Sequence, residues 1–376
     1  MRVLVLDTIH GGATLAEALL RRGDDVDAID VYRGGTLTPE EAVKRKYDCI
    51  TAPIHLDPDY SLLHTETKIV SHHEMTKDLI GDFSKPIIEI TGSRGKTTTA
   101  FAVASLFDTK SILHTSRGTF LMPEGKLLFK KSITPASLLF AVKAAETYGA
   151  QRIIAEESVG VTGVGELGIL TSTDDYKIAA GKKSALEAKL KSLEPCQKVL
   201  VPKGISKKPG WETIDDIISV NGNKLTYSGG SFENPLLSIP LYCDVIKTAA
   251  AAAVILGISP EKLAGFSAIE GRMNLFEEDG VTVMDNSNSG TTAQGCIEAA
   301  KFLRKNSDKK IILAIGQEFH AVCEGFSEEE IQKAVYEIAP AKVIRAEKSF
   351  DEVRDEALRL AKENDGCVLL GVKTWR

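Results

Sequence analysis

A strand, a glycine loop and a helix are predicted to follow one another directly between residues 86 and 107. The apolar run Ile87–Ile90 is typical of a buried strand, TGSRGKTT follows at residues 91–98, and residues 97–107 have helical spacing. In a phosphate-binding loop of this order, backbone N–H groups surround the phosphates, a lysine reaches the terminal phosphate and a hydroxyl meets magnesium. The segment therefore predicts an α/β nucleotide-binding domain in which Lys96 and Thr97 have these two roles.

The loop is shorter than the common GxxxxGK[ST] pattern, because only four residues separate Thr91 from Lys96. An ordinary glycine turn into a helix is the alternative interpretation of such a loop. The strand in front of it favours phosphate binding, since strand, loop and helix is the order that this use requires. The predicted nucleotide-binding residues of the loop are Gly92, Ser93, Arg94, Gly95, Lys96, Thr97 and Thr98.

Strand-like and helical runs alternate along the whole chain, which at 376 residues is too long for one ordinary core. We predict three α/β domains: a small Rossmann-like unit in residues 1–85, a central doubly wound P-loop domain in residues 86–270 with an antiparallel insert, and a third domain in residues 271–376. Gly11 and Gly12 follow the first strand without forming GxGxxG. A tight turn and an anion site at a helix N-terminus both remain open there.

The charge and the apolar runs exclude two classes of partner. The net charge is −6, whereas a nucleic-acid coat needs a basic stripe. No run approaches the roughly 20 apolar residues that span a bilayer, and the N-terminus MRVLVLDTIHGG lacks the pattern of a signal peptide. The six cysteines are scattered without a CxxC pair, as expected of buried or surface thiols in a reducing cytosol. We therefore expect a cytoplasmic protein, and no oligomeric state is predicted.

Several segments along the chain resemble the Mur ligase superfamily of ATP-dependent carboxylate ligases. The loop TGSRGKTT is close to the short TGTNGKTT loop of that family, and ITPASL at residues 133–138 is similar to its TTP motif. The other matching segments are IIAEES at 153–158, KKSALEAKLKSL at 182–193, IEGRMN at 269–274 and DNSNSGTT at 285–292. The resemblance implies a three-domain Mur ligase-like architecture, with the third domain closing over ATP.

The resemblance also implies roles for individual residues. Glu156 matches the magnesium ligand, with Glu157 as its neighbour, and Lys189 matches a lysine that is carbamylated in many members and supports a second metal ion. Arg272 would contact nucleotide phosphate. Asp285, followed by Asn286, would meet the ribose or base. Lys96, Glu156, Lys189 and Arg272 are thus the predicted catalytic residues, and ATP with two magnesium ions the predicted cofactors.

The departures from the family pattern concern the second metal site and the incoming amine. Asp174 and Asp175 stand where the family carries a histidine, so the metal ligand there is open between the two acids. The C-terminal region lacks the DNPR-like signature by which some peptide ligases recognise an amino acid. The predicted metal ligands are Thr97, Glu156, Glu157, Asp174, Asp175 and Lys189.

The small size, the opening LDTIHGG, the loop and the DNSNSGTT run resemble the archaeal branch of this family that completes coenzyme F-430. That resemblance implies activation of a propionate of a nickel tetrapyrrole precursor as an acyl phosphate, followed by carbon–carbon ring closure. Nickel would enter only as part of the substrate. Two alternatives stay open, a Mur-type amide ligase and a non-catalytic ATP-binding protein.

Three histidines near the N-terminus were also considered as contacts. His10, beside Gly11 and Gly12, is a candidate contact for an acidic macrocycle, although a plain turn explains the segment equally well. Adjacent His72 and His73 lie in a polar helical stretch, and we expect them to be solvated rather than to bind metal.

Overall fold

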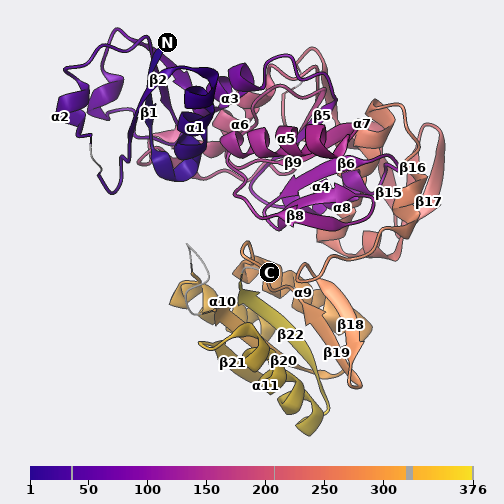
Figure 1. Cartoon of the computed structure of the whole chain (residues 1–376). Coiled ribbons are helices and arrows are strands. Elements are labelled where there is room, and N and C mark those ends of the chain that lie inside the picture. Colours follow the sequence, from indigo (N-terminus) through magenta and orange to yellow (C-terminus); the bar gives the residue numbers. More distant parts are fainter. Residues whose placement is uncertain (35–36, 207, 319–324, 375–376) are drawn as a thin grey trace. The chain divides into compact units, whose positions relative to one another are not determined.

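Three α/β sheets carry the fold of the described residues, which are 1–34, 37–206, 208–318 and 325–374 of the computed structural model (Figure 1). The chain divides into two compact units. The first contains residues 1–234 and 244–265, and the second contains residues 235–243 and 266–376. The α/β fold class predicted from the sequence is confirmed by these sheets. The three-domain division at residues 85 and 270 stays a prediction.

The N-terminal sheet of the first unit is parallel, with strand order β2-β1-β3-β4. Its central strand β1 is apolar and fully buried from Val3 to Leu6, because helices cover it on both sides. The strands are β1 Arg2–Leu6, β2 Asp25–Ile29, β3 Cys49–Ala52 and β4 Lys68–Ser71, and the helices are α1 Ala13–Arg22, α2 Pro39–Ala42 and α3 His72–Ile80.

The polar stretch that carries His72 and His73, expected to be helical, begins with a strand. Lys68–Ser71 forms the edge strand β4, which pairs in parallel with β3. An edge strand of four partly exposed residues has no apolar alternation that would identify it. Ser71 then begins α3 with a capping box, since its hydroxyl accepts from Glu74 N while the Glu74 carboxylate accepts from Ser71 N.

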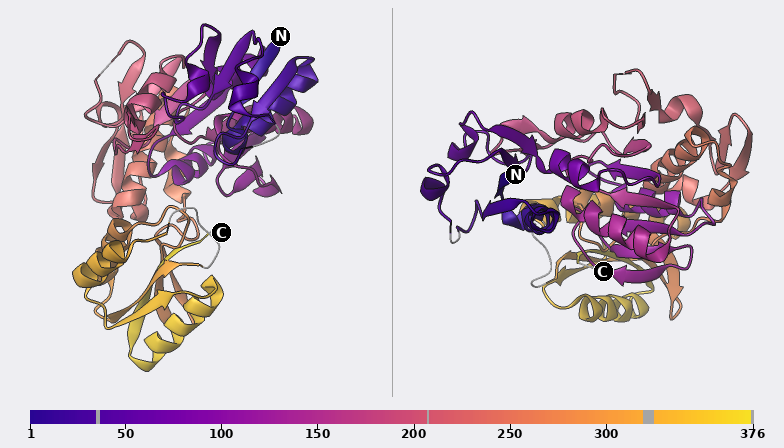
Figure 2. Two further views of the ribbon diagram at one scale, coloured as in Figure 1. Left: turned by 90° about the vertical axis from the view of Figure 1, so that its left-hand side faces the viewer. Right: turned by 45° about the horizontal axis from the view of Figure 1, so that its top comes forward.

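The second sheet of the first unit has strand order β14-β13-β10-β5-β9-β6-β7-β8. Figure 2 shows the ribbon of the chain from two further sides. Pairing is parallel from β14 to β6, and the hairpin β6-β7-β8 adds an antiparallel edge. The strands are β5 Ile87–Thr91, β6 Ser111–Thr115, β7 Gly118–Met122, β8 Lys126–Phe129, β9 Arg152–Glu156, β10 Leu167–Leu170, β13 Lys198–Val201 and β14 Trp211–Thr213.

Helices α4 Lys96–Ala104, α5 Leu138–Tyr148 and α6 Ala185–Leu193 pack on this sheet. Apolar residues of α5 form a core with Ile87, Ile112 and Ile153, and Leu193 of α6 forms another with Leu170. The predicted antiparallel insert is confirmed as a three-stranded sheet. The remaining elements are β11 Lys177–Ile178, β12 Lys183–Ser184, α7 Ile214–Ile217, β15 Ser219–Asn221, β16 Lys224–Tyr227, β17 Gly230–Glu233 and α8 Pro240–Ile255.

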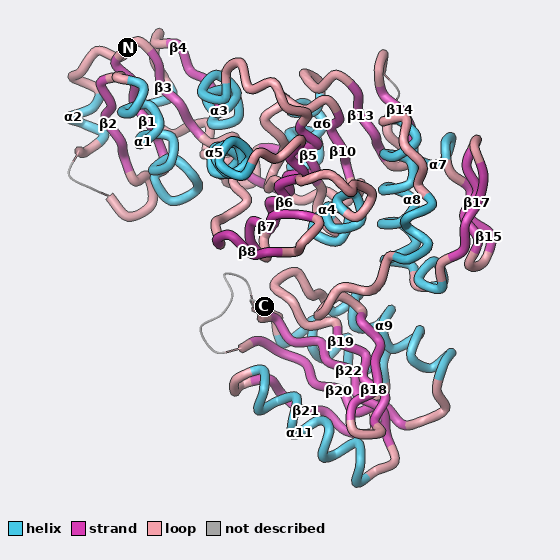
Figure 3. Tube along the Cα trace, turned by 45° about the vertical axis from the view of Figure 1, so that its right-hand side comes forward, coloured by secondary structure: helices cyan, strands magenta, loops and turns pink. Residues whose placement is uncertain are grey.

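The second unit is built on a five-stranded sheet of order β18-β19-β22-β20-β21, in which only β18 is antiparallel to its neighbour among the described strands. Figure 3 shows helices on both sides of it. Alternate residues of β20 point to opposite faces, so that Ile312 packs with Val353 of α11. The elements are β18 Asn274–Glu278, β19 Val281–Asp285, α9 Ala293–Asn306, β20 Lys310–Gln317, α10 Glu328–Ile338, β21 Lys342–Ala346, α11 Phe350–Glu363 and β22 Gly366–Lys373.

Two further sequence predictions concern cysteines and membranes. Cys49, Cys196, Cys243, Cys296 and Cys367 are free thiols, and all but Cys243 are buried; Cys323 lies outside the described residues. No helix in the described part of the chain is long and apolar enough to cross a membrane.

Candidate functional site

The glycine loop lies at the carboxyl end of β5, between the ends of β10 and β9. Parallel strands bring their carboxyl ends to one sheet edge, where ligands of α/β proteins bind. Gly92 has φ +148°, and a Cβ there would lie 2.1 Å from Thr171 Oγ1. Gly95 has φ +80° and directly precedes α4. Both glycines are required by the backbone, because an L side chain would be strained at each and would also clash at Gly92.

Residues that follow β10 brace this loop. The Ser172 hydroxyl accepts hydrogen bonds from Ser93 N at 3.0 Å and from Arg94 N at 3.3 Å. Thr171 Oγ1 donates to Arg94 O at 2.6 Å. The loop conformation is therefore set before any ligand arrives, which lowers the entropic cost of binding phosphate.

Thr97 and Glu156 are brought together in the way that the sequence predicts. The Thr97 hydroxyl donates to the Glu156 carboxylate, at 3.0 Å from Oε1 and 2.9 Å from Oε2. Ser116 N also donates to Glu156 Oε2, at 3.0 Å, and the Ser116 hydroxyl lies 3.2 Å from Thr97 Oγ1. A carboxylate and two hydroxyls at the phosphate loop are hard oxygen donors, which fit Mg²⁺ together with phosphate oxygens and water.

Glu157 lies on the other side of the backbone from Glu156, as expected for consecutive residues at a strand end. It is buried, and its carboxyl oxygens have no hydrogen-bond partner among the described residues. Burial, followed by the negative charge of nearby Glu89, raises the pKa of Glu157 well above its ordinary value. The raised pKa favours the protonated form of Glu157, whereas Mg²⁺ favours a charged carboxylate.

Glu89, in the middle of β5, is the second buried carboxyl group of this region. Its carboxylate accepts from three backbone N–H groups, those of Thr162 at 2.8 Å, Gly163 at 3.2 Å and Gly165 at 2.7 Å. The Thr162 hydroxyl donates to it as well. Several donors of this kind stabilise a carboxylate inside a protein, so Glu89 holds the loop of residues 162–165 against the strand.

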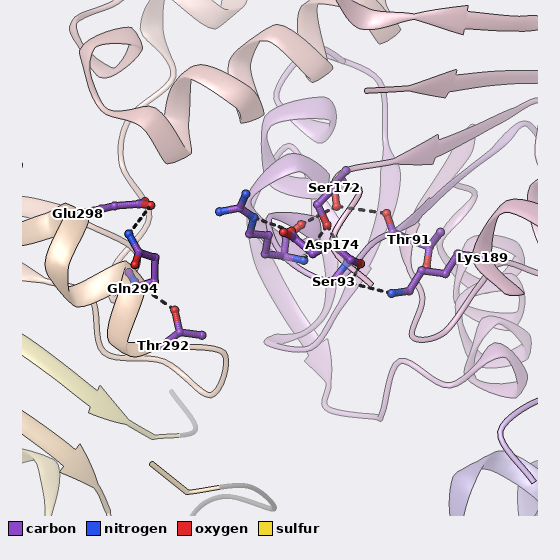
Figure 4. A network of polar contacts seen from close by, with 11 residues as sticks. Thr91, Ser93, Ser172, Asp174, Lys189, Thr292, Gln294 and Glu298 are labelled. Atoms are coloured by element: carbon purple, nitrogen blue, oxygen red, sulfur yellow. Dashed lines mark hydrogen bonds and ion pairs between the residues drawn. The ribbon is translucent and has the colours of Figure 1, made fainter. Parts of the chain in front are cut away.

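Lys189 on α6 is fully buried, although a lysine on a helix would ordinarily be exposed. Its Nζ donates to Ser93 Oγ at 2.9 Å and lies 4.6 Å from the centroid of the Tyr176 ring (Figure 4). Burial, and then the positive charge of Lys96, lower the pKa of Lys189 to about 8. A lysine with this pKa is partly neutral at physiological pH, and only the neutral amine reacts with CO₂ to form a carbamate.

The two acids that replace the family histidine have different partners. Asp174 pairs with Arg94 of the loop at 2.8 Å, and its backbone oxygen accepts from Ser93 Oγ at 2.7 Å (Figure 4). Asp175 Oδ1 accepts from Ser184 Oγ and Leu186 N, both at 2.9 Å. Asp175 thus fixes the start of α6, which leaves Asp174 as the acid that contacts the loop.

The predicted residues Arg272, Asp285 and Asn286 belong to the second unit. Asp285 ends β19 and is buried, and its Oδ1 accepts from Ser287 N at 2.9 Å. The Asn288 side chain donates to Gly271 O at 2.8 Å, which ties the DNSNSGTT run to the segment that carries Arg272. Their roles toward a nucleotide stay predictions.

The expectation that His72 and His73 are solvated is wrong. Both are buried at the start of α3, which packs against α1 and α5 of the first unit. His72 Nε2 donates to Leu6 O at 2.9 Å, and burial lowers the pKa of His72 to about 4 and that of His73 to about 3. Both imidazoles are therefore neutral, and a polar helical sequence did not reveal that two other helices cover this one.

Ser116, Ser172 and Glu89 are site residues that the sequence analysis missed. Ser116 lies in the turn between β6 and β7, and no motif connects it with Thr97. Ser172 belongs to the segment ILTSTDDY, in which only Asp174 and Asp175 were predicted to be ligands. Glu89 could have been noticed, because it is the one charged residue within the apolar strand IIEIT.

Comparisons with known proteins give a consistent result. The family described as "Coenzyme F430 synthetase CfbE, C-terminal domain" matches residues 276–371. Coenzyme F(430) synthetase of Methanosarcina acetivorans is 31% identical over 412 aligned residues, which cover 88% of this chain and 86% of that protein. The same enzyme of Methanocaldococcus jannaschii is 29% identical over 213 residues, covering 51% of this chain and 50% of that protein.

Solved structures of similar fold include two ligases. MurF of Thermotoga maritima in complex with ADP has a TM-score of 0.53 at 14% identity and covers 90% of this chain and 87% of its own. The UDP-N-acetylmuramoylalanyl-D-glutamyl-2,6-diaminopimelate–D-alanyl-D-alanyl ligase of Acinetobacter baumannii has a TM-score of 0.55 at 13% identity, with coverage of 90% and 83%. At these identities the likeness shows the Mur ligase fold.

Proposed function

Because the chain belongs to the coenzyme F(430) synthetase family, we propose that it uses ATP to close a carbocyclic ring on a nickel tetrapyrrole precursor of that coenzyme. The observation that carries the proposal is the match over nearly the full length of a coenzyme F(430) synthetase, in a chain whose phosphate loop brings Thr97 onto Glu156. The chain is accordingly an ATP-dependent ligase.

The proposed reaction has two steps. A propionate oxygen of the precursor attacks the γ-phosphorus of ATP, so that an acyl phosphate forms and ADP leaves. A carbon of the same macrocycle then gives up a proton to a base and attacks the acyl carbon, which forms the carbon–carbon bond and expels phosphate. The overall change is loss of one water from the precursor, with ATP converted to ADP and phosphate.

Positioned positive charges and hydrogen-bond donors provide most of the catalysis in such phosphoryl transfer. In this proposal the loop N–H groups and Lys96 hold the phosphates, and Arg272 of the second unit adds a second cation. Thr97 and Glu156 would hold one Mg²⁺, which neutralises charge on the phosphates. Lys189, as its carbamate, would support a second Mg²⁺ ion, with Asp174 nearby at the loop. Glu157 takes no part in this proposal, because its side chain lies on the other side of the backbone and burial raises its pKa.

The partners in this proposal are ATP and one small acidic macrocycle, and nickel belongs to the substrate. An intramolecular reaction needs no binding site for an amine, which agrees with the missing amino-acid signature. The peptide ligases that share the fold make an amide ligase the second candidate. The two differ in whether turnover requires an amine.

The experiment is ADP release from the purified protein with Mg-ATP and the nickel precursor, with and without a mixture of amino acids. We expect precursor-dependent ADP release that amino acids do not change, together with a shift in the visible spectrum of the pigment. Lys96→Ala serves as the inactive control. ADP release that appears only with an amine would establish the amide ligase instead, and ATP binding without release under any condition would establish a non-catalytic protein.

A further inference from the structure

The turn after β1 is held in a strained conformation around a buried carboxylate. Asp7 is fully buried and has φ +67°, a region that residues other than glycine rarely adopt. Its Oδ1 accepts from Ile9 N at 3.0 Å and His10 N at 3.2 Å. These bonds engage Oδ1 and leave the second carboxylate oxygen, Oδ2, for other groups. Strain of this kind persists where the surrounding structure enforces it, and it is concentrated at functional sites.

Two imidazoles from different segments converge on that second oxygen. His10 Nδ1 lies 2.7 Å from Asp7 Oδ2, and His55 Nε2 lies 3.3 Å from the same atom. The two rings meet edge to face, with centroids 4.9 Å apart. One potential ligand atom from each of the three residues lies within 4.8 Å of the other two. The three side chains thus surround a common point at the carboxyl edge of the N-terminal sheet.

His55 shows that hydrogen bonding alone does not account for this arrangement. Its Nε2 is enclosed, but it makes no hydrogen bond with any described residue. The 3.3 Å between His55 Nε2 and Asp7 Oδ2 is short enough for a hydrogen bond, so the ring N–H must point away from that oxygen. Buried ring nitrogens are normally hydrogen-bonded. The approach of His55 is therefore explained better by a ligand shared with Asp7 and His10 than by an ion pair.

We propose that Asp7, His10 and His55 form a binding site for a divalent transition-metal ion of the nickel, cobalt and zinc class. Two imidazoles and one carboxylate suit these ions, whereas Mg²⁺ prefers oxygen ligands only. Metal–ligand bonds of about 2.0–2.1 Å place neighbouring ligand atoms about 3 Å apart. This is close to the 2.7 Å and 3.3 Å that separate the two imidazole nitrogens from Asp7 Oδ2. The three ligand atoms lie within 4.8 Å of one another, and the half-exposed His10 side chain has room to adjust toward an ion.

The accessibility of the cluster agrees with metal binding. The His10 side chain is 46% exposed and that of His55 27%, so an ion reaches the site from solvent and keeps coordination positions for water or a ligand carboxylate. This site is separate from Thr97 and Glu156, and it does not depend on the proposed ring closure.

The test is a titration of tag-free protein with Co²⁺, followed by calorimetry and by the visible absorption that cobalt gains on imidazole ligation. All proteins carry Glu156→Gln, so that the magnesium site does not contribute. We expect one equivalent bound, with affinity at least about tenfold weaker in His55→Ala and in His10→Ala. His64→Ala is the matched control, because His64 is an exposed histidine outside the cluster, and it should bind as tightly as the parent.

Circular dichroism of each variant checks that the fold is retained. The His55 variant is the decisive one, since His55 caps no helix and fixes no turn, in contrast to Asp7. Equal cobalt affinity in the parent, His55→Ala and His64→Ala would overturn the proposal, as would binding without the visible bands of imidazole ligation.

Discussion

Glu156→Gln tests the magnesium role of Glu156 against its structural surroundings. Glu156 is buried and accepts from Thr97 at 2.9 and 3.0 Å and from Ser116 N at 3.0 Å. Glutamine keeps the size and one acceptor oxygen, so the fold should persist, but it removes the negative charge. A hydrogen bond or ligand contact to a charged group contributes about 1.5–3 kcal/mol. The half-saturating Mg²⁺ concentration for ATP turnover should therefore rise by roughly 10- to 100-fold.

The matched control is Glu157→Gln, one residue further along. Glu157 is equally buried, but burial raises its pKa and so favours the protonated carboxyl group, which glutamine closely resembles. Its Mg²⁺ dependence should stay within about twofold of the wild type, judged against the 10-fold or larger change expected at Glu156. ADP formation measured across a Mg²⁺ series gives both values. Equal shifts in the two variants, or a larger one at Glu157, would refute the assignment of the charged ligand to Glu156.

Three further predictions concern the groups around this site. In urea unfolding between pH 5 and 8, the stability of Glu157→Gln relative to the wild type should rise with pH. The reason is that folded Glu157 retains a proton that the unfolded chain releases above about pH 4.3. A stability difference that is constant with pH would contradict the raised pKa. Added bicarbonate should increase the turnover of wild type depleted of CO₂ but not that of Lys189→Met, and an equal response in both would exclude a carbamate at this lysine. Lys96→Ala should lose ADP formation while its circular dichroism is unchanged, and full activity would disprove the phosphate loop.

The sequence was sufficient to predict the elements of the site that are local in the chain. Strand, glycine loop and helix follow one another between residues 87 and 104, so their geometry is determined by propensity and by two glycines with positive φ. Thr97 was predicted as a magnesium ligand from the loop motif and Glu156 from the family resemblance, and the structure brings them together because Glu156 ends β9, the parallel neighbour of β5. The resemblance to a family supplied which of the two adjacent glutamates faces the loop.

Contacts that depend on tertiary packing could not be predicted in this way. Ser116 reaches Thr97 from a hairpin, and nothing in its local sequence indicates that approach. The burial of His72 and His73 results from helices that cover α3, and a short polar helix gives no sign of them. His55 joins Asp7 and His10 across a separation of more than 40 residues with no recognisable motif.

The most direct test of the account is the mass of the pigment product formed by this protein from the nickel precursor and Mg-ATP, measured alongside the ADP released. Ring closure through an acyl phosphate predicts a product lighter than the precursor by one water, with one ADP formed per product and no amine incorporated. A product heavier by the residue of an added amine would contradict the carbon–carbon closure, and so would ADP release that leaves the precursor mass unchanged.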